Sequence, residues 1–229
     1  MFIGVNRYFL VFLFAFAIQR NGLGELIIIV QDATMTEGSN TAFVDVFLSG
    51  QAGDTLGRFG YEFTISGAVA QSGDVQFRLT QSNSEQTEAG PPSYVFLGDT
   101  DPGNFNSVRS GGDPVTLVGG DFLNSLDSVP VNGTFLLARL ELEHVGAMSL
   151  PNHQFTISLN PANSEFDRDF DPGTNVPGIS DNYGSFTSLS GTITVNAAAV
   201  PEPSSILLLG SALFLSFSYR CRIRRRYAP

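Results

Sequence analysis

The chain has 229 residues, with 22 acidic residues against 12 basic ones, one Cys, 24 Gly and 12 Pro. All the basic residues are Arg, which excludes mechanisms that need a lysine nucleophile or Schiff base. The single cysteine excludes an internal disulfide and any metal site built from several cysteines. The net charge of −10 argues against a nucleic-acid binder, which needs a basic surface.

The first segment, residues 1–17, has the pattern of a secretory signal peptide. Arg7 precedes an uncharged apolar run at 8–18, which is too short to span a bilayer comfortably because a span takes about 20 residues. Ala15-Phe16-Ala17 supplies the small residues of a cleavage site, so we expect cleavage after Ala17. An uncleaved anchor and a misassigned start codon are the alternatives.

Residues 18–199 are predicted to form one exported domain. This region carries 21 acidic residues and 6 Arg, a net charge of −15, and no cysteine. Its hydrophobic core must therefore suffice without disulfides, which is feasible for a domain of this length.

Apolar and polar residues alternate along this domain with the period of half-buried strands. The predicted inward faces are Val44, Val46 and Leu48; Phe59, Tyr61, Phe63 and Ile65; Ala138, Leu140 and Leu142; Phe155, Ile157 and Leu159; and Ile193 and Val195. Weaker candidates are 26–31, 75–80, 94–97 and 115–118, with one helical turn at 120–126. About nine strands separated by Gly- and Pro-rich turns predict an all-β, two-sheet antiparallel sandwich. Two long segments, 81–114 and 161–189, are expected to be functional loops or crossovers between the sheets.

The order of these strands resembles the cohesin-like, jelly-roll sandwich modules of bacterial surface proteins. The similarity spans 26–196 and rests on the strand at 43–48, the aromatic strand at 59–65, the Gly-led strand at 133–142 and the closing strands at 155–159 and 190–195. Cohesins often carry a Tyr-Asp pair at the end of the aromatic strand, where this chain has Thr64-Ile65-Ser66-Gly67. The resemblance therefore does not imply dockerin binding, and a fold alone does not assign a function.

Residues 200–229 form a tail in three parts. Pro201, Glu202 and Pro203 precede an uncharged hydrophobic segment at 204–219. A basic cluster follows at once, formed by Arg220, Arg222, Arg224, Arg225 and Arg226, with Cys221 among them. We predict a transmembrane helix at 204–219 with the Arg-rich end, 220–226, held in the cytoplasm. A helix of this length covers about 24 Å of a hydrocarbon core that is ~30 Å thick, which suits a transient anchor.

This tail resembles the PEP-CTERM sorting signal of bacteria, which an integral-membrane, transpeptidase-like exosortase recognises and cleaves near the Pro-Glu-Pro motif. The resemblance implies that Pro201, Glu202 and Pro203 are the recognition motif and that the Arg cluster is the topogenic stop. It also implies a precursor anchored in the inner membrane, followed by release to the cell envelope or extracellular matrix. An ordinary C-terminal tail anchor is the alternative, and Cys221 is a lipid-attachment site or a bystander.

Asp167, Asp169 and Asp171 are the candidate ligands for calcium. Alternate carboxylates suit a hard cation, and Ca²⁺ would also reduce repulsion in the acidic domain. However, Gly173 falls one place late for an EF-hand loop, and Gly178 stands where the loop needs Glu. We therefore favour an acidic turn that needs no cofactor, with Asp side chains accepting from backbone N–H groups. Asp99-Thr100-Asp101 is a weaker pattern of the same kind.

No arrangement of residues indicates catalysis. His144 and His153 are too few for a three-histidine metal site, and the chain has no nucleophile-elbow, His-Glu-x-x-His or phosphate-loop motif. Glu141 and Glu143 share a strand face, as the acid and base of a glycosidase could. Alternation along that strand favours a solvated face instead, so we predict that the protein is not an enzyme.

The sequence thus predicts an exported, non-enzymatic protein of the cell envelope or extracellular matrix that associates with exopolysaccharide. A calcium- or carbohydrate-binding adhesion module and a secreted hydrolase are the alternatives. Phe43 and Phe47 could stack on a sugar from the outer face of their strand, although packing under a neighbouring element is favoured.

Overall fold

The computed structural model describes residues 25–39, 41–67, 75–100, 107–125, 128–145, 153–168, 170–171, 176–177 and 182–197. The chain divides into two units, Met1–Asn196 and Ala197–Pro229, and the description below concerns the first. The predicted signal helix and the predicted transmembrane helix at 204–219 lie outside the described residues. Within the ranges given above, no helix is long and apolar enough to cross a membrane.

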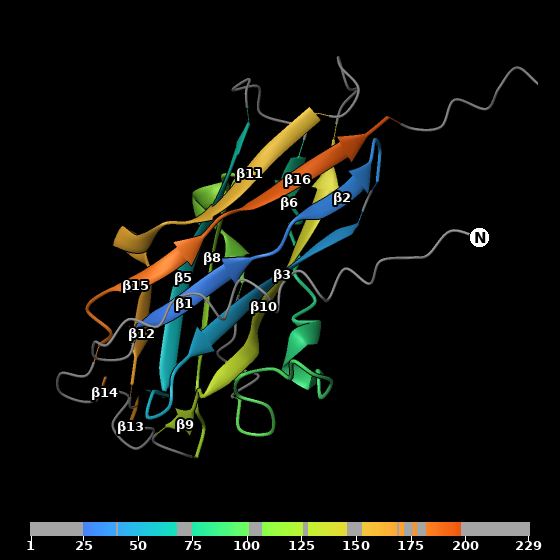
Figure 1. Cartoon of the computed structure of the whole chain (residues 1–229). Helices are drawn as coiled ribbons and strands as arrows, with labels where there is room; N and C mark the ends of the chain where they lie inside the picture. The colour runs from blue at the N-terminus through green and yellow to red at the C-terminus, as the bar shows by residue number, and fades with distance from the viewer. Residues whose placement is uncertain are drawn as a thin grey trace, which may run out of the picture. The chain divides into compact units, whose positions relative to one another are not determined.

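The described residues form a β-sandwich of two sheets (Figure 1). The five-stranded sheet has the order β15 (Phe186–Leu189), β1 (Leu26–Val30), β3 (Ala42–Gly50), β10 (Gly133–His144) and β6 (Val75–Phe77). The seven-stranded sheet has the order β2 (Ala33–Thr36), β16 (Gly191–Asn196), β11 (His153–Leu159), β5 (Arg58–Gly67), β8 (Thr116–Phe122) and β7 (Val108–Arg109), with β12 (Glu165–Asp167) also on β5.

Short elements complete the fold. Two small two-stranded sheets pair β4 (Thr55–Leu56) with β9 (Val129–Pro130) and β13 (Phe170–Asp171) with β14 (Val176–Pro177). Three 3₁₀ turns, η1 (Ser84–Thr87), η2 (Ser110–Gly112) and η3 (Pro161–Asn163), lie in the connections. The two long segments predicted as loops therefore contain several short strands and turns.

The core lies between the two sheets and includes all the residues that the period-two pattern placed inward. None of the predicted inward residues is more than 7% exposed. Burying one such large apolar side chain contributes about 1.5–3 kcal/mol relative to leaving it in water. Phe96, from the connection before β7, joins this core and stacks on Phe59 with ring centroids 5.4 Å apart. The predicted all-β sandwich is confirmed.

Two pairs of hydrogen-bonded strands run parallel, whereas an antiparallel sandwich was predicted. β1 runs parallel to β15, and β2 runs parallel to β16. The first two strands and the last two strands of the domain thus lie side by side. Each pair of consecutive strands passes from the five-stranded sheet to the seven-stranded sheet (Figure 1).

Two local predictions are wrong. Residues 94–97 form a turn instead of a strand, and Tyr94 makes an isolated bridge to Leu136 of β10. The helical turn predicted from Gly120 is absent because Gly119 and Gly120 continue β8. A Cβ on Gly120 would lie 2.5 Å from the carbonyl oxygen of Phe59, so the glycine lets β8 approach β5 closely.

Candidate functional site

The outer edge of β10 is covered by side chains and turns from a segment that is distant in sequence. β6 pairs with β10 only at Leu142–His144. Beyond that point residues 78–97, here called the edge segment, take over the role of a strand. Gln81 Oε1 accepts from the backbone N–H of Glu141 at 2.7 Å, and Gln81 Nε2 donates to the Glu141 carbonyl at 3.0 Å. Such coverage removes the unpaired edge that would invite another strand.

The far end of the edge segment reaches a bulged part of β10. The register of β10 against β3 shifts between Leu136 and Ala138. There the carbonyl of Ser93 accepts from the N–H of Leu136 at 2.9 Å, and the N–H of Val95 donates to the Leu136 carbonyl at 3.0 Å. The edge of β10 is therefore hydrogen-bonded on both sides of the region that carries Arg139.

Glu141 is buried under the edge segment, although alternation predicted a solvated face. Its side chain is 2% exposed. Burial works to raise the pKa of Glu141, but hydrogen bonds from Ser82 and the ion pair with Arg78 outweigh it and lower that pKa. The two contacts are Ser82 N–H to Oε1 at 2.8 Å and Arg78 Nη1 to Oε2 at 2.5 Å. The pairing leaves Glu141 ionised and structural.

Glu85, in η1, is buried on the same edge in a contrasting environment. It is 1% exposed, and its Oε2 has no hydrogen-bond partner among the described residues. Desolvation raises the pKa of Glu85 to about 7, against the lowering effect of backbone hydrogen bonds from Glu85 itself and Arg139. This carboxyl group exchanges its proton near neutral pH.

Tyr94 connects the edge segment with the seven-stranded sheet, which carries a second buried tyrosine, Tyr61. The hydroxyl of Tyr94 donates to Asp121 Oδ2 at 2.6 Å, and the hydroxyl of Thr100 donates to the same oxygen at 2.5 Å. Tyr61 is hydrogen-bonded to Ser107 at 2.8 Å. Burial raises the pKa of both tyrosines well above its usual value, so both hydroxyls stay protonated donors near neutral pH.

Sequence reasoning missed this cluster of Glu85, Tyr61, Tyr94 and Asp121. Glu85 lies in a segment predicted as a loop, and Asp121 lies in the helical turn predicted at 120–126. Tyr61 and Tyr94 lie on predicted strands whose partners were unknown. The one available signal was Tyr61 on a predicted inward face, because a buried tyrosine hydroxyl needs a hydrogen-bond partner.

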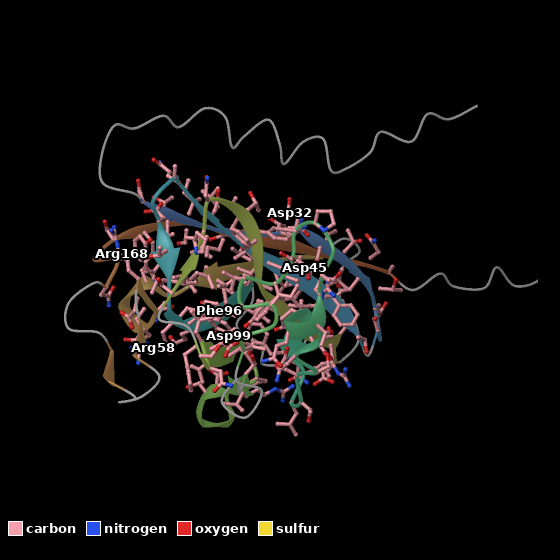
Figure 2. All side chains as sticks on the ribbon, turned by 90° about the horizontal axis from the view of Figure 1, so that it is seen from below. Asp32, Asp45, Arg58, Phe96, Asp99 and Arg168 are labelled. Atoms are coloured by element: carbon pink, nitrogen blue, oxygen red, sulfur yellow. The ribbon has the colours of Figure 1, made fainter. Side chains whose placement is uncertain are left out.

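The predicted calcium ligands are only partly described by the structure. Asp167 is buried, and its Oδ2 accepts from Arg58 Nε at 2.8 Å. Asp171 lies in β13, whereas Asp169 lies outside the described residues. Figure 2 shows Arg58 and Arg168 toward one end of the sandwich, away from Asp32 and Asp45. No group of three metal-ligating side chains comes together within the described ranges.

In the weaker acidic pattern at 99–101, the side chain of Asp99 binds a neighbouring turn. The carboxylate of Asp99 accepts from the backbone N–H of Ser125 at 3.1 Å and also from its hydroxyl. This arrangement matches the favoured expectation of an Asp side chain that satisfies backbone donors. Asp101 lies outside the described residues.

The other sequence candidates are engaged in structural contacts. Glu143 Oε1 accepts from Arg109 Nη2 at 2.7 Å and from Gln76 Nε2 at 2.7 Å. His144 Nδ1 accepts from the N–H of Gly38 at 3.1 Å, whereas His153 lies in the other sheet and packs on Phe155. Glu141 and Glu143 are thus each paired with an arginine.

The two aromatic candidates for sugar stacking differ in exposure. Phe43 is 51% exposed, whereas Phe47 is 7% exposed although it lies outside the main core cluster. The expectation of packing therefore holds for Phe47, and Phe43 keeps an open ring.

The predicted sorting residues Pro201, Glu202 and Pro203 and the Arg cluster at 220–226 lie outside the described residues. The comparison with family models nevertheless finds one match there: residues 199–225 match the PEP-CTERM protein-sorting motif. The predicted sorting signal is confirmed. Such a signal indicates export, with a membrane-anchored precursor that an exosortase processes. A comparison with curated proteins finds no match.

Solved structures with a similar fold are cohesin modules. A chain of a type I cohesin–dockerin complex from Clostridium thermocellum is 12% identical, and the match covers 79% of this chain and 99% of that chain with a TM-score of 0.51. The seventh ScaB type I cohesin from Pseudobacteroides cellulosolvens is 11% identical, with coverage of 78% and 96% and a TM-score of 0.49. The first likeness confirms a cohesin-like fold and nothing beyond the fold. The comparisons indicate no catalytic family.

Proposed function

We propose that this chain is an exported, non-enzymatic protein of the cell envelope or extracellular matrix. The observation that carries the proposal is the three-part tail at 200–226, which overlaps the sorting motif matched at 199–225. The β-sandwich is the part that acts outside the cell. Its titratable side chains described above are paired or buried in ways that support a structural role.

The tail and the sandwich have separable tasks in this proposal. The hydrophobic segment at 204–219 holds the precursor in the inner membrane, and the Arg-rich end stops translocation. β16 ends at Asn196, so a spacer of only Ala197-Ala198-Ala199-Val200 separates the last strand from Pro201. Cleavage near Pro201-Glu202-Pro203 would free the acidic domain and leave the hydrophobic segment in the membrane, with the Arg cluster and Cys221 on its cytoplasmic side.

Mass spectrometry of the mature C-terminus tests this proposal in the native host. In released protein we expect a C-terminus near the Pro-Glu-Pro motif, without the Arg-rich end. Glu202→Ala is expected to leave full-length protein in the membrane fraction, whereas the matched variant Ser205→Ala is processed normally. An intact Arg-rich end on protein that has left the inner membrane would overturn the sorting proposal.

Exopolysaccharide is the proposed partner of the released domain. A domain with a net charge of −15 repels an anionic polymer, so we expect it to prefer an uncharged one. Co-sedimentation with an uncharged glucan and with a polyuronate, each with and without Ca²⁺, checks this preference. Binding to the glucan that weakens in Phe43→Ala would support stacking by the exposed ring. Equal failure with both polymers would count against the polysaccharide partner.

A protein-binding module is the second candidate function. The observation that favours it is the cohesin-like fold, since the similar chain from Clostridium thermocellum belongs to a cohesin–dockerin complex. Crosslinking of the released protein at the cell surface, followed by identification of crosslinked peptides, distinguishes the candidates. Crosslinks to one protein at defined sandwich residues would favour the binding module over the polymer.

Calcium at Asp167, Asp169 and Asp171 stays a proposal as well. The Arg58 ion pair already occupies one oxygen of Asp167, so Ca²⁺ would have to share or replace that arginine. Calorimetric titration with Ca²⁺ alone checks the site, with Asp169→Asn and Asp171→Asn as variants that keep the Arg58 pair. Absence of heat, together with an unchanged melting temperature, would remove calcium from the function.

A further inference from the structure

Glu85 and Glu141 are two buried glutamates on one edge of β10 that meet different partners. Both oxygens of Glu141 accept hydrogen bonds, one of them from a guanidinium. Glu85 has no ion pair of its own, and its Oε2 lacks a hydrogen-bond partner among the described residues. A buried carboxylate in such surroundings is costly, whereas a neutral carboxyl group is not.

The charges around Glu85 do not compensate for its ionisation. From β10, Arg139 attracts it, but that guanidinium already binds Asp45 of β3 through two bonds of 2.6 and 3.0 Å. Glu88 lies 3.6 Å from the same guanidinium. Asp45 itself repels a Glu85 carboxylate.

The seven-stranded sheet offers no compensation either. Tyr61 of β5 interacts electrostatically with Glu85 and stays neutral. Tyr94 stays neutral too, and its partner Asp121 of β8 is a second acid in the same cluster. The described groups that face Glu85 thus comprise one arginine that is already paired, several acids and two neutral tyrosines.

We propose that the edge segment, residues 78–97, is a pH-sensitive latch: neutral Glu85 holds it against β10, and ionisation of Glu85 releases it. Glu85 is well placed for this task because it lies in the middle of the segment. Hydrogen bonds to Glu141 through Gln81 lie before it in the sequence, and the contacts of Ser93 and Val95 with Leu136 lie after it.

The direction of the pH response follows from the two states. In the closed state the pKa of Glu85 is about 7, and in an opened segment it returns toward its ordinary value of 4.5. The closed state therefore binds the proton more tightly. The stability that this tighter proton binding gives to the closed state is fully present below the ordinary pKa of 4.5. It is lost as the pH rises through the closed-state pKa of about 7. Between these values the opening equilibrium constant increases about tenfold per pH unit, and above them it is constant.

Release of the segment would uncover a strand edge. The backbone N–H groups of Leu136 and Glu141 would lose their acceptors, and Glu141 would lose Arg78 and Ser82 together. An uncovered edge of this kind is a template for an added strand, from a partner or from another copy. The latch would therefore make strand pairing at β10 depend on the pH outside the cell.

Hydrogen–deuterium exchange of the full chain in detergent, followed by mass spectrometry of peptides, tests the latch. At each pH, the exchange rate of peptides within 133–142 in the wild type is divided by the rate of the same peptides in Glu85→Gln. This ratio is informative because pH changes the chemical exchange rate of exposed amides equally in both proteins. We expect this ratio to rise about tenfold per unit from about pH 5 to about pH 7 and then to level off. Leu79→Ala, a change of an exposed side chain in the same segment, should behave as the wild type.

A ratio that does not change with pH would overturn the proposal. So would an equal rise in peptides from β5, since that result means global unfolding instead of local release. If Glu85→Gln does not fold, carbon NMR of the Glu85 carboxyl group in the wild type decides the matter. A titration midpoint near 7 supports the latch, and a midpoint near 4.5 overturns it.

Discussion

The carboxylate of Asp32 accepts a hydrogen bond from the backbone N–H of Thr192 at 2.7 Å, across 160 positions in the sequence. Asp32 lies between β1 and β2, and Thr192 lies at the start of β16. The contact therefore joins the two points where the first and the last strands pass from one sheet to the other. It ties the beginning of the domain to its end.

Gly191 is required at this crossing because the backbones approach too closely for a side chain. A Cβ at this position would lie 2.4 Å from the carbonyl oxygen of Gln31 and 2.9 Å from that of Val30. We expect Gly191→Ala to lower the free energy of unfolding by about 1–3 kcal/mol through overpacking. Urea denaturation measures the change. Gly184→Ala is the matched control, since nothing lies within 4 Å of its Cβ, and equal stability of the two variants would contradict the prediction.

The strands that were predicted from the sequence are those with a strong period of two. The inward residues of β3, β5, β10, β11 and β16 all lie in the core, because alternation depends only on neighbouring residues in the chain. β2 and β15 were missed because Ala33–Thr36 and Phe186–Leu189 are short and mix polar with apolar residues. Their parallel pairing depends on contacts between the two ends of the domain, which no local pattern records.

The buried polar cluster could not be predicted for a similar reason. Glu141 alternates with Leu140 and Leu142 as a solvated residue would, and its cover comes from residues about sixty positions earlier. Glu85 lies in a polar stretch without periodicity, where burial has no local signature. The sorting signal is different, because its composition and order along the chain carry the whole motif.

Tyr94 and Tyr61 are expected to differ in their contributions to stability. Tyr94 donates to the buried Asp121 carboxylate at 2.6 Å, whereas Tyr61 is bonded to the neutral Ser107 hydroxyl. Hydrogen bonds to charged groups contribute about 1.5–3 kcal/mol and neutral ones about 0.5–1.5 kcal/mol. Tyr94→Phe should therefore lower the free energy of unfolding more than Tyr61→Phe. Chemical denaturation of both variants in parallel checks the order, and the reverse order would contradict the assigned network.

Arg109 joins the two sheets where β6 and β7 form their edges. These edges lie at the other end of each sheet order from β15 and β2. From β7 it donates to Glu143 of β10 at 2.7 Å and to the carbonyl of Phe77 in β6. Arg109→Met keeps most of the apolar stem but removes one donor from each acceptor, while Glu143 keeps its hydrogen bond from Gln76. We expect a loss of about 1–3 kcal/mol in unfolding free energy and faster amide exchange in β6 than in β3. Unchanged exchange in β6 would show that the arginine does not hold this edge.

Arg78→Met should destabilise the fold because it leaves Glu141 buried with one donor fewer. The arginine side chain is 38% exposed, so solvent screens its charge, and we expect a loss of about 1–3 kcal/mol instead of the larger cost of a fully buried pair. Arg78→Lys, which keeps the positive charge, should recover part of this loss.

The effect of Arg78→Met should also depend on pH. The pKa of Glu141 is lowered in the folded state, so the stability that it contributes is present above its ordinary value of 4.5 and is lost as the pH falls through the lowered value. The difference between the wild type and Arg78→Met is therefore expected to be largest near neutral pH and to shrink in acid below the ordinary value of 4.5, as the pH falls through the lowered pKa and Glu141 becomes protonated. Denaturation curves in both pH ranges measure this difference. A difference of equal size at both would mean that Arg78 acts through packing and not through the Glu141 carboxylate.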